Sequence, residues 1–324
     1  MTIPVLTVTL NPALDQTILL PHLRVGEVNR ASAALLHAGG KGVNVAACLA
    51  DWAPTGITAT GLLGTANQAA FTSLFKAKSI TDGFLRVPGE TRTNIKLSHD
   101  GGTTDINLPG LEVPADMVAS LAETLSGLIQ PGGLVLLAGS LPEGLPPDLY
   151  PLLMEQVIAG GARVLVDSSG APLKAALRGP VLPYAIKPNR EELEDFIGYA
   201  LPDDAAVLQA ARVLNKHGVA LVVVSLGADG ALFVTAQAAL RAALPPLRVT
   251  STVGAGDAMM AGMIAGLRDN AGLERIARLG TAFAAGKLAN PGANLPPRQE
   301  IEALAERVQI IDQKFNQQSG GQGI

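Results

Sequence analysis

The sequence predicts an α/β protein in which helices cover a mainly parallel central sheet. Of its 324 residues, 48% are hydrophobic but only 3% are aromatic, so small aliphatic side chains must fill a large core. That composition is typical of buried parallel strands under alanine-rich helices. Short apolar runs alternate with stretches of helical length, and this alternation predicts βαβ units. The runs cover residues 134–139, 163–166, 185–186 and 221–224, with helices predicted over 149–159 and 205–217.

Each of these strands ends at a small or polar residue. Ser140, Asp167, Lys187 and Ser225 follow the four runs in order. In open parallel sheets, ligands bind outside the carboxyl ends of the strands. We therefore expect these residues to lie at a ligand site along one edge of the sheet.

Two segments depart from the alternation of strands and helices. Residues 15–33 look extended, with a break at Pro21 and a turn near Gly26, and residues 85–110 alternate polar and apolar side chains around a turn at 100–102. Such alternation indicates strands with one buried and one exposed face. We expect a small inserted sheet that forms a lid over the site or a dimer surface. The predicted main domain covers 1–13, 34–84 and 111–312, the lid covers 14–33 and 85–110, and a flexible tail covers 313–324.

Charge, cysteine content and hydropathy exclude several classes of function. Lys and Arg number 24 against 28 acidic residues, and the net charge of −4 argues against nucleic acid as the main partner. The apolar run 258–267 falls well short of the about 18 residues that span a bilayer, and residues 1–12 show no signal-peptide pattern. The single cysteine, Cys48, cannot form an internal disulfide. We therefore expect a cytoplasmic protein that binds neither membranes nor nucleic acid.

A first glycine motif precedes a helix rich in alanine and methionine. Gly254, Ala255 and Gly256 come directly before Asp257. Backbone N–H groups at the start of a helix bind anions, because they are unpaired and lie at the positive end of the helix dipole. Asp257 would then lie beside a bound anion. The alternative is an ordinary helix start with a favourable acidic residue.

A second glycine motif, Gly39-Gly40-Lys41-Gly42-Val43-Asn44, also leads into a helix. It is not a Walker A loop, because Gly42 rather than Ser or Thr follows Lys41. Either this loop brings a lysine to a ligand, or it is a tight turn with a solvated lysine.

A third motif follows the strand at 185–186. Asn189 is followed three residues later by Glu192, which is the spacing of a capping box at a helix start. The spacing alone favours the cap. In the alternative reading, the same two side chains hold water on a magnesium ion.

Asp15 and Arg92 lie where the strands of the inserted sheet are expected to meet the main domain. Asp15 could accept hydrogen bonds from substrate hydroxyls, and Arg92 could bind a phosphate through its forked guanidinium group. The alternatives are a turn aspartate and a surface arginine. The four histidines show no metal-ligand spacing, so we expect no zinc site.

Together these motifs resemble those of the PfkB/ribokinase family of carbohydrate kinases. Gly39-Gly-Lys-Gly-x-Asn44 and Thr252-x-Gly-Ala-Gly-Asp257 are similar to its two signatures, and Lys187-Pro-Asn-x-x-Glu192 resembles its magnesium-associated motif. Ser225-Leu-Gly-Ala-Asp-Gly230 resembles its nucleotide-contacting loop. The resemblance covers nearly the whole chain. It implies a ribokinase-like three-layer α/β/α domain with an inserted β lid.

Three further segments are Thr9-Leu-Asn-Pro-Ala-Leu-Asp15, Gly26-Glu-Val-Asn29 and Thr91-Arg-x-Asn-x-Lys96. They resemble the branch of the family that phosphorylates fructose 1-phosphate. This resemblance implies that ATP phosphorylates the C6 hydroxyl to give fructose 1,6-bisphosphate, with kinases of tagatose 6-phosphate or fructose 6-phosphate as alternatives. It implies that Asp257 takes the hydroxyl proton and that N–H groups of Gly254, Ala255 and Gly256 form an anion hole. The implied sugar-binding residues are Asp15, Gly39, Gly40, Asn44 and Ser140, with Lys41 and Arg92 on the phosphate that the sugar carries.

The resemblance also implies the contacts of the nucleotide and ions. Glu192 and Asn189 would hold magnesium largely through waters, and Asn290 lies in the region where family members often bind a monovalent cation such as K⁺. We expect a homodimer formed through the lid. The residues implied to contact ATP are Lys187, Asn189, Ser225, Gly227, Ala228, Asp229 and Gly230.

Two other classes of function fit the sequence less well. A dinucleotide-dependent oxidoreductase needs a G-x-G-x-x-G turn after its first strand, but Val5–Leu10 leads into Asn11-Pro12. A non-catalytic sugar sensor on the same fold has no need of Asp257.

Overall fold

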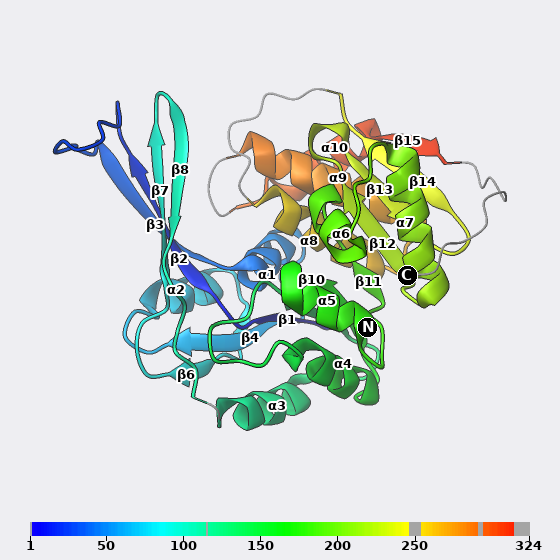
Figure 1. Ribbon diagram of the computed structural model, residues 1–324, viewed down its shortest axis with the longest axis horizontal. Coiled ribbons are helices and arrows are strands. Elements are labelled where there is room, and N and C mark those ends of the chain that lie inside the picture. The colour runs from blue at the N-terminus through cyan, green and yellow to red at the C-terminus, as the bar shows by residue number, and fades with distance from the viewer. Residues whose placement is uncertain (1, 115, 246–253, 291–293, 314–324) are drawn as a thin grey trace.

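The computed structural model describes residues 2–114, 116–245, 254–290 and 294–313. Within these residues, the large sheet has eleven strands in the order β15-β14-β13-β12-β11-β10-β9-β1-β4-β5, with β6 paired to β4 (Figure 1). Pairing is parallel from β12 to β5, and β13 to β15 extend the sheet in antiparallel pairs. The strands are β1 Val5–Thr9, β4 Ile57–Gly64, β5 Thr81–Asp82, β6 Leu85–Val87, β9 Leu134–Ala138, β10 Arg163–Asp167, β11 Ala185–Ile186, β12 Leu221–Ser225, β13 Ala231–Val234, β14 Ala239–Ala243 and β15 Gln309–Asp312.

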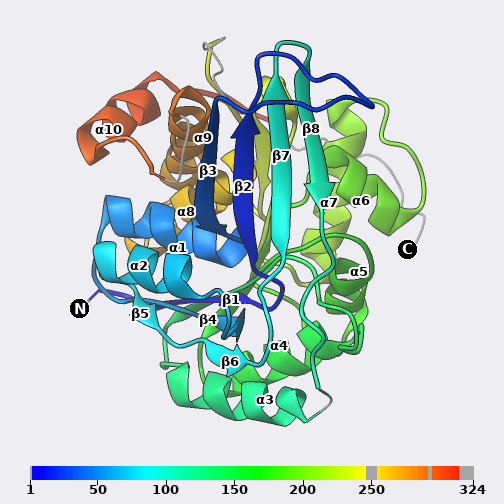
Figure 2. The ribbon, with the colours of Figure 1, turned by 90° about the vertical axis from the view of Figure 1, so that its left-hand side faces the viewer.

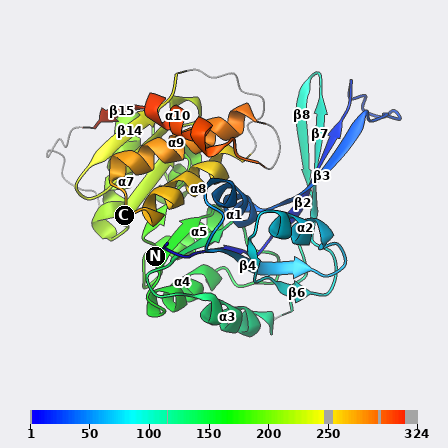
Figure 3. The same ribbon diagram turned by 180° about the vertical axis from the view of Figure 1, so that it is seen from behind.

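Two hydrophobic clusters lie on opposite faces of this sheet, because successive side chains of a strand point to opposite sides. In β1, Val5 joins one cluster, whereas Leu6 and Val8 join the other. The first cluster contains side chains of α1 Lys41–Trp52, α2 Ala69–Ala77, α8 Ala255–Arg268, α9 Leu273–Ala289 and α10 Arg298–Arg307. The second contains side chains of α3 Met117–Leu128, α4 Leu149–Ala159, α5 Gly170–Arg178, α6 Arg190–Ile197 and α7 Asp204–His217. The predicted three-layer α/β/α arrangement is therefore confirmed (Figure 3).

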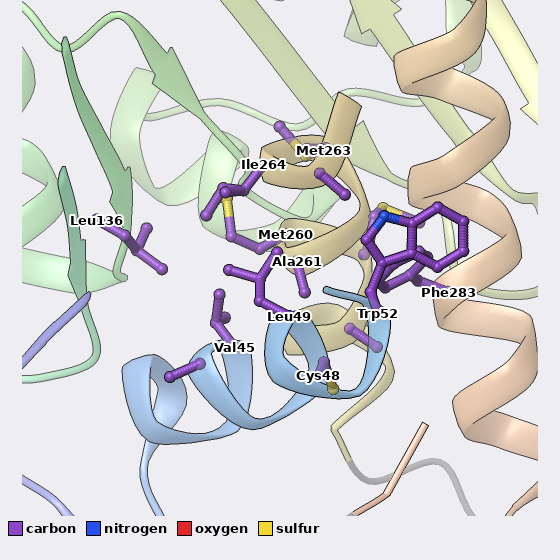
Figure 4. Packing of buried hydrophobic residues seen from close by; sticks show 14 of the residues in the cluster. Val45, Cys48, Leu49, Trp52, Leu136, Met260, Ala261, Met263, Ile264 and Phe283 are labelled. Carbon is purple, nitrogen blue, oxygen red and sulfur yellow. The ribbon is translucent and has the colours of Figure 1, made fainter. Parts of the chain in front are cut away.

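The helices α8 and α9 pack closely along their middle parts. A Cβ atom at Gly262 would collide with the backbone of Leu279, so this contact requires glycine. Trp52 of α1 packs against Phe283 of α9 with ring centroids 5.2 Å apart (Figure 4). Cys48 is buried in the same cluster, and burial raises the pKa of its thiol to about 12. It is therefore a packing residue.

A second sheet of four strands, in the order β3-β2-β7-β8, stands beside the large one (Figures 1 and 2). The small inserted sheet predicted from the sequence is thus present, but strand pairing draws its limits differently. β3 belongs to it although residues 34–84 were assigned to the main domain, and β6 joins the large sheet although 85–110 were assigned to the lid. The alternation is weak in β3, whose sequence is AALLHAG, and β6 is too short to show any. The strands are β2 Ala13–Leu19, β3 Ala33–Gly39, β7 Thr93–His99 and β8 Gly102–Asn107.

No helix among the described residues is both long and apolar enough to cross a membrane. Residues 314–324 of the predicted tail lie outside the described part of the chain.

Candidate active site

The carboxyl ends of β9, β10, β11 and β12 meet the starts of α1 and α8 at one edge of the large sheet (Figure 1). The strand-end residues expected at a ligand site lie here, together with both glycine motifs. The sequence folds this way because buried parallel strands align their carboxyl ends, and each following loop must leave the sheet at that edge.

The start of α8 is built for an anion. Gly254 is its N-cap, with a φ of 76° in the left-handed region that favours glycine. No side chain among the described residues caps this helix with a hydrogen bond, and its first N–H groups point away from the helix, where a ligand can accept from them. Asp257 follows in the first turn and is half-buried. Thr252 of the same motif lies outside the described residues.

Asp257 has the properties of a general base that works near neutral pH. Burial, reinforced by the nearby negative charge of Asp167, raises the pKa of Asp257 to about 6. Asn44 opposes this rise, because its Nδ2 donates a hydrogen bond of 2.8 Å to Asp257 Oδ2. The structure thus brings Asn44 to the base itself, across 213 positions of sequence.

The glycines before α1 allow the two sheets and the helix to approach one another. A Cβ atom at Gly39 would collide with the carboxylate of Asp15, and Gly40 has a φ of 112°. Gly40 also lies against Thr9 Cγ2, which a Cβ atom would approach to 2.9 Å. The motif is therefore a close junction between β3 and α1, and Lys41 is the first residue of that helix.

Asp167, at the end of β10, joins two lysines. Its Oδ1 accepts a hydrogen bond of 2.9 Å from Lys41 Nζ, and its Oδ2 lies 3.4 Å from Lys187 Nζ. Burial favours the neutral form of Asp167, but Lys187 and Lys41 outweigh burial and lower the pKa of the carboxyl group. Burial likewise opposes the charge of Lys41, but Asp167 raises its pKa. Asp167 lies at the predicted ligand edge, but its sequence context indicates no role for it.

The third motif forms the capping box that its spacing predicts. Asn189 Oδ1 accepts a hydrogen bond of 2.7 Å from the N–H of Glu192, and Glu192 Oε2 accepts one of 2.9 Å from the N–H of Asn189. Glu192 keeps its second carboxylate oxygen for another partner. No group of three or more acidic, histidine or cysteine side chains within the described ranges could form a metal cage. One carboxylate beside bound phosphates nevertheless fits magnesium, which usually keeps several waters.

The loop from Ser225 to Gly230 lies beside Asn189. Asn189 and Ser225 form a parallel bridge, and the N–H of Ser225 donates to the carbonyl of Pro188 over 3.0 Å. Gly227–Asp229 form one turn of 3-10 helix, and a Cβ atom at Gly230 would collide with the carbonyl of Ala242. The structure therefore gathers the residues expected to contact the nucleotide. Asn290 is the exposed C-cap of α9, and the neighbouring residues 291–293 are outside the described part.

The base of the small sheet supplies a second polar cluster. Asp15 Oδ1 accepts a hydrogen bond of 3.1 Å from Asn94 Nδ2, and burial raises the pKa of Asp15. Arg92 Nη2 donates to the carbonyl of Asn11 over 3.4 Å, and Asn11 Nδ2 donates to Ser140 Oγ over 3.1 Å. Asn11 and Asn94 belong to segments that resemble the family, but the sequence assigned them no role. An asparagine near Pro12 or Arg92 in an extended segment has too weak a signal to be separated from a turn residue.

Several buried polar atoms in these clusters make no hydrogen bond within the described part of the chain. They are Asn11 Oδ1, Arg92 Nε and Asn94 Oδ1, all at the base of the small sheet. Buried polar groups are almost always paired, so atoms left without hydrogen bonds around one region indicate a polar ligand.

An anion-binding helix start beside a base of near-neutral pKa is the arrangement of an enzyme that transfers phosphoryl groups to a small molecule. Within that class, the chain belongs to the pfkB family of carbohydrate kinases, which its residues 8–300 match. It is thus a sugar kinase, as the motifs indicated.

Individual relatives agree with this assignment. The chain is 51% identical over 315 residues to the 1-phosphofructokinase of Xanthomonas campestris pv. campestris, covering 96% of this chain and 99% of that protein. It is 43% identical over 314 residues to the 1-phosphofructokinase of Rhodobacter capsulatus, covering 96% and 98%. Among solved structures, it is similar to phosphofructokinase-2 from Escherichia coli in complex with substrates and products, with a TM-score of 0.86, 30% identity and coverage of 94% and 99%. The ribokinase-like fold is confirmed.

Proposed function

We propose that this protein transfers the γ-phosphoryl group of ATP to the C6 hydroxyl of fructose 1-phosphate, giving ADP and fructose 1,6-bisphosphate. The observation that carries the chemistry is the half-buried Asp257 in the first turn of α8, which accepts a hydrogen bond from Asn44 of α1. The choice of fructose 1-phosphate is supported by relatives named 1-phosphofructokinase that are up to 51% identical along nearly the whole chain.

In the proposed reaction, Asp257 accepts the proton of the C6 hydroxyl as its oxygen attacks the γ-phosphorus. The bond from that phosphorus to the bridging oxygen of ADP breaks as the new bond forms. Such transfer needs in-line positioning and stabilisation of spread negative charge more than covalent chemistry. The N–H groups of Gly254, Ala255 and Gly256 would supply part of that stabilisation.

We assign the sugar end of the substrate to the second polar cluster. Asp15, held by Asn94, would accept hydrogen bonds from sugar hydroxyls, and Ser140 would line the pocket. Arg92 would bind the phosphate that the sugar carries. Its Nε is buried without a hydrogen bond, which a phosphate oxygen would supply.

We assign magnesium to Glu192 and Asn189, through waters, beside the phosphates of ATP. When bound, the ion would neutralise phosphate charge. Lys187 and the Ser225–Gly230 loop would contact the nucleotide. A structure of phosphofructokinase-2 from Escherichia coli contains potassium, and we propose that a monovalent cation binds here near Asn290.

A coupled assay of ADP release across free and phosphorylated sugars tests the proposal. Fructose 1-phosphate should give the highest kcat/KM, and aldolase should cleave the product as fructose 1,6-bisphosphate. If fructose 6-phosphate or tagatose 6-phosphate gives the highest value, the protein is still a sugar-phosphate kinase but the proposed substrate is wrong. If a sugar without phosphate gives the highest kcat/KM, the role proposed for Arg92 is wrong as well.

We also propose a homodimer formed through the small sheet. Leu36, Gln16, Ile95 and Ile106 form one cross-strand row, in which Leu36 is 52% and Ile106 is 45% exposed. The adjacent row contains Asp15 and points to the opposite face, because side chains alternate along a strand. The first face is therefore apolar and uncovered in the single chain.

Light scattering of Ile106→Asp tests the dimer. The variant should become monomeric at micromolar concentration, since a charge in an apolar interface is costly. Thr103→Asp, on the opposite face of the same strand, is the control and should remain dimeric. A dimer that survives Ile106→Asp would place the interface elsewhere.

A further inference from the structure

We propose that Asp167 is a positioning residue that holds Lys41 and Lys187 against the phosphoryl group during its transfer from ATP. Lys41 then contacts the transferred phosphoryl group and not the phosphate that the sugar carries. This inference rests on the proposed kinase function and changes the role that the motif alone assigned to Lys41.

The geometry of the three side chains carries the first step. Asp167 is 1% exposed and uses one carboxylate oxygen for each lysine, at 2.9 Å to Lys41 and 3.4 Å to Lys187. Each ammonium group has three N–H donors. The cluster as a whole carries one excess positive charge, and the Lys41 side chain is 35% exposed, so it opens toward a ligand.

The position of the cluster relative to the base carries the second step. A Cβ atom at Gly256 would lie 3.4 Å from Lys187 Nζ, so this ammonium group adjoins the backbone directly before Asp257. Asp167, Asp257 and Glu192 are the acidic groups that contribute most to raising the pKa of Lys41. Lys41 and Lys187 therefore flank the base and the nucleotide side of the site.

Arg92 belongs to a different group of charges, and this carries the third step. The charge that acts on Arg92 is that of Asp15, and Arg92 contacts Asn11 at the base of the small sheet. The two cations that the sequence assigned to one phosphate thus lie in two clusters. Arg92 remains with the sugar-binding residues, whereas Lys41 lies with the reacting ones.

The chemistry explains why two lysines should be held in this way. In phosphoryl transfer, negative charge is spread over the three equatorial oxygens of the transferred group. A fixed cation stabilises that charge most when it needs no reorganisation during the reaction. A flexible lysine meets this condition only if a buried partner fixes its ammonium group, which Asp167 does for both.

The test is the division of effects between kcat and KM in Lys41→Met, with Arg92→Ala as the matched control. Lys41→Met should lower kcat by about 100-fold, the scale of removing one charge-stabilising donor, and leave the KM of fructose 1-phosphate within a few-fold. Arg92→Ala should raise the KM of fructose 1-phosphate and leave kcat within a few-fold. A rise in KM at nearly unchanged kcat in Lys41→Met would overturn the inference.

A binding measurement that needs no sugar separates this inference from the proposed substrate. Magnesium, ADP and aluminium fluoride together imitate the transferred phosphoryl group, and the wild-type protein should bind them more tightly than magnesium and ADP alone. Lys41→Met should lose that gain and keep its affinity for magnesium and ADP. If fructose 1-phosphate proves not to be the substrate but the gain is lost, only the substrate proposal fails. If the gain persists, the inference fails.

Asp167→Asn tests the positioning role. Its kcat should fall by at least about tenfold, and the double variant with Lys41→Met should be little worse than Lys41→Met alone, because coupled residues are non-additive. Additive losses would show that Asp167 does not act through Lys41. If Asp167→Asn fails to fold, Asp167→Glu keeps the charge and displaces it, and unchanged kcat in that variant would overturn the positioning role.

Discussion

The edge of the large sheet and the small sheet hold the two halves of the site in different ways. All five residues of β1 and four of the five in β10 are buried, so Asp167 at the end of β10 is fixed by core packing. In β8 every residue is exposed, and five of the seven in β3 are exposed. The reacting groups therefore lie on the rigid part of the molecule. Of the groups assigned to the sugar, Asp15 lies on the small sheet and Arg92 directly precedes its strand β7. A sheet with so few buried residues can move relative to the core.

Replacing the base should give the largest effect, because it removes chemistry from the rigid half. Asp257→Asn should lower kcat by about 10²-fold or more, the scale of general-base catalysis, with little change in the KM of either substrate. Steady-state kinetics with fructose 1-phosphate measures this. Retention of normal kcat would remove Asp257 from the mechanism and make the edge of the sheet a binding surface only.

Replacing Arg92 at the base of the small sheet should weaken substrate binding and leave kcat nearly unchanged. Arg92→Ala should weaken the sugar phosphate by about 1.5–3 kcal/mol, the range for hydrogen bonds to charged groups. That is a rise in KM of about ten- to a hundredfold, with the KM of ATP changing much less. Equal losses in kcat and in kcat/KM would contradict the division of labour between the two regions.

The same contrast explains what the sequence could predict. Buried strands have a strong apolar signal, so the fold was predicted correctly, and the structure gathers the strand-end residues and the glycine motifs at one edge of the large sheet. Contacts that join distant segments have no local signal. The hydrogen bond from Asn44 to Asp257 and the sharing of Asp167 by two lysines depend on how α1, β10 and α8 pack. The assignment of β3 depended on pairing with β2, which its own weak alternation did not reveal.

The pH dependence of the reaction should report on the contacts of the base. Asp257 must be ionised to accept a proton, and its pKa is about 6, so kcat/KM should fall as the pH drops below about 6. Asn44 lowers this pKa, and Asn44→Ala should therefore move the acid limb to higher pH. Asp167 raises the pKa, and Asp167→Asn should move the limb to lower pH. If the acid limb moves in the same direction in both variants, a group other than Asp257 controls the pH profile.

The smallest effect is expected at Glu192, where two roles overlap. A glutamine carbonyl can still accept the N–H of Asn189, so Glu192→Gln should keep the capping box and change the free energy of unfolding by less than about 0.5 kcal/mol. It removes the negative charge, so half-maximal rate should need several-fold more magnesium while kcat at saturating magnesium stays nearly normal. Glu192→Ala is the control for the cap. It should require the same extra magnesium and also lose about 0.5–2 kcal/mol of stability. If the magnesium requirement of Glu192→Gln equals that of the wild type, Glu192 only caps α6, and the metal is held by the nucleotide and by other residues at this edge of the large sheet.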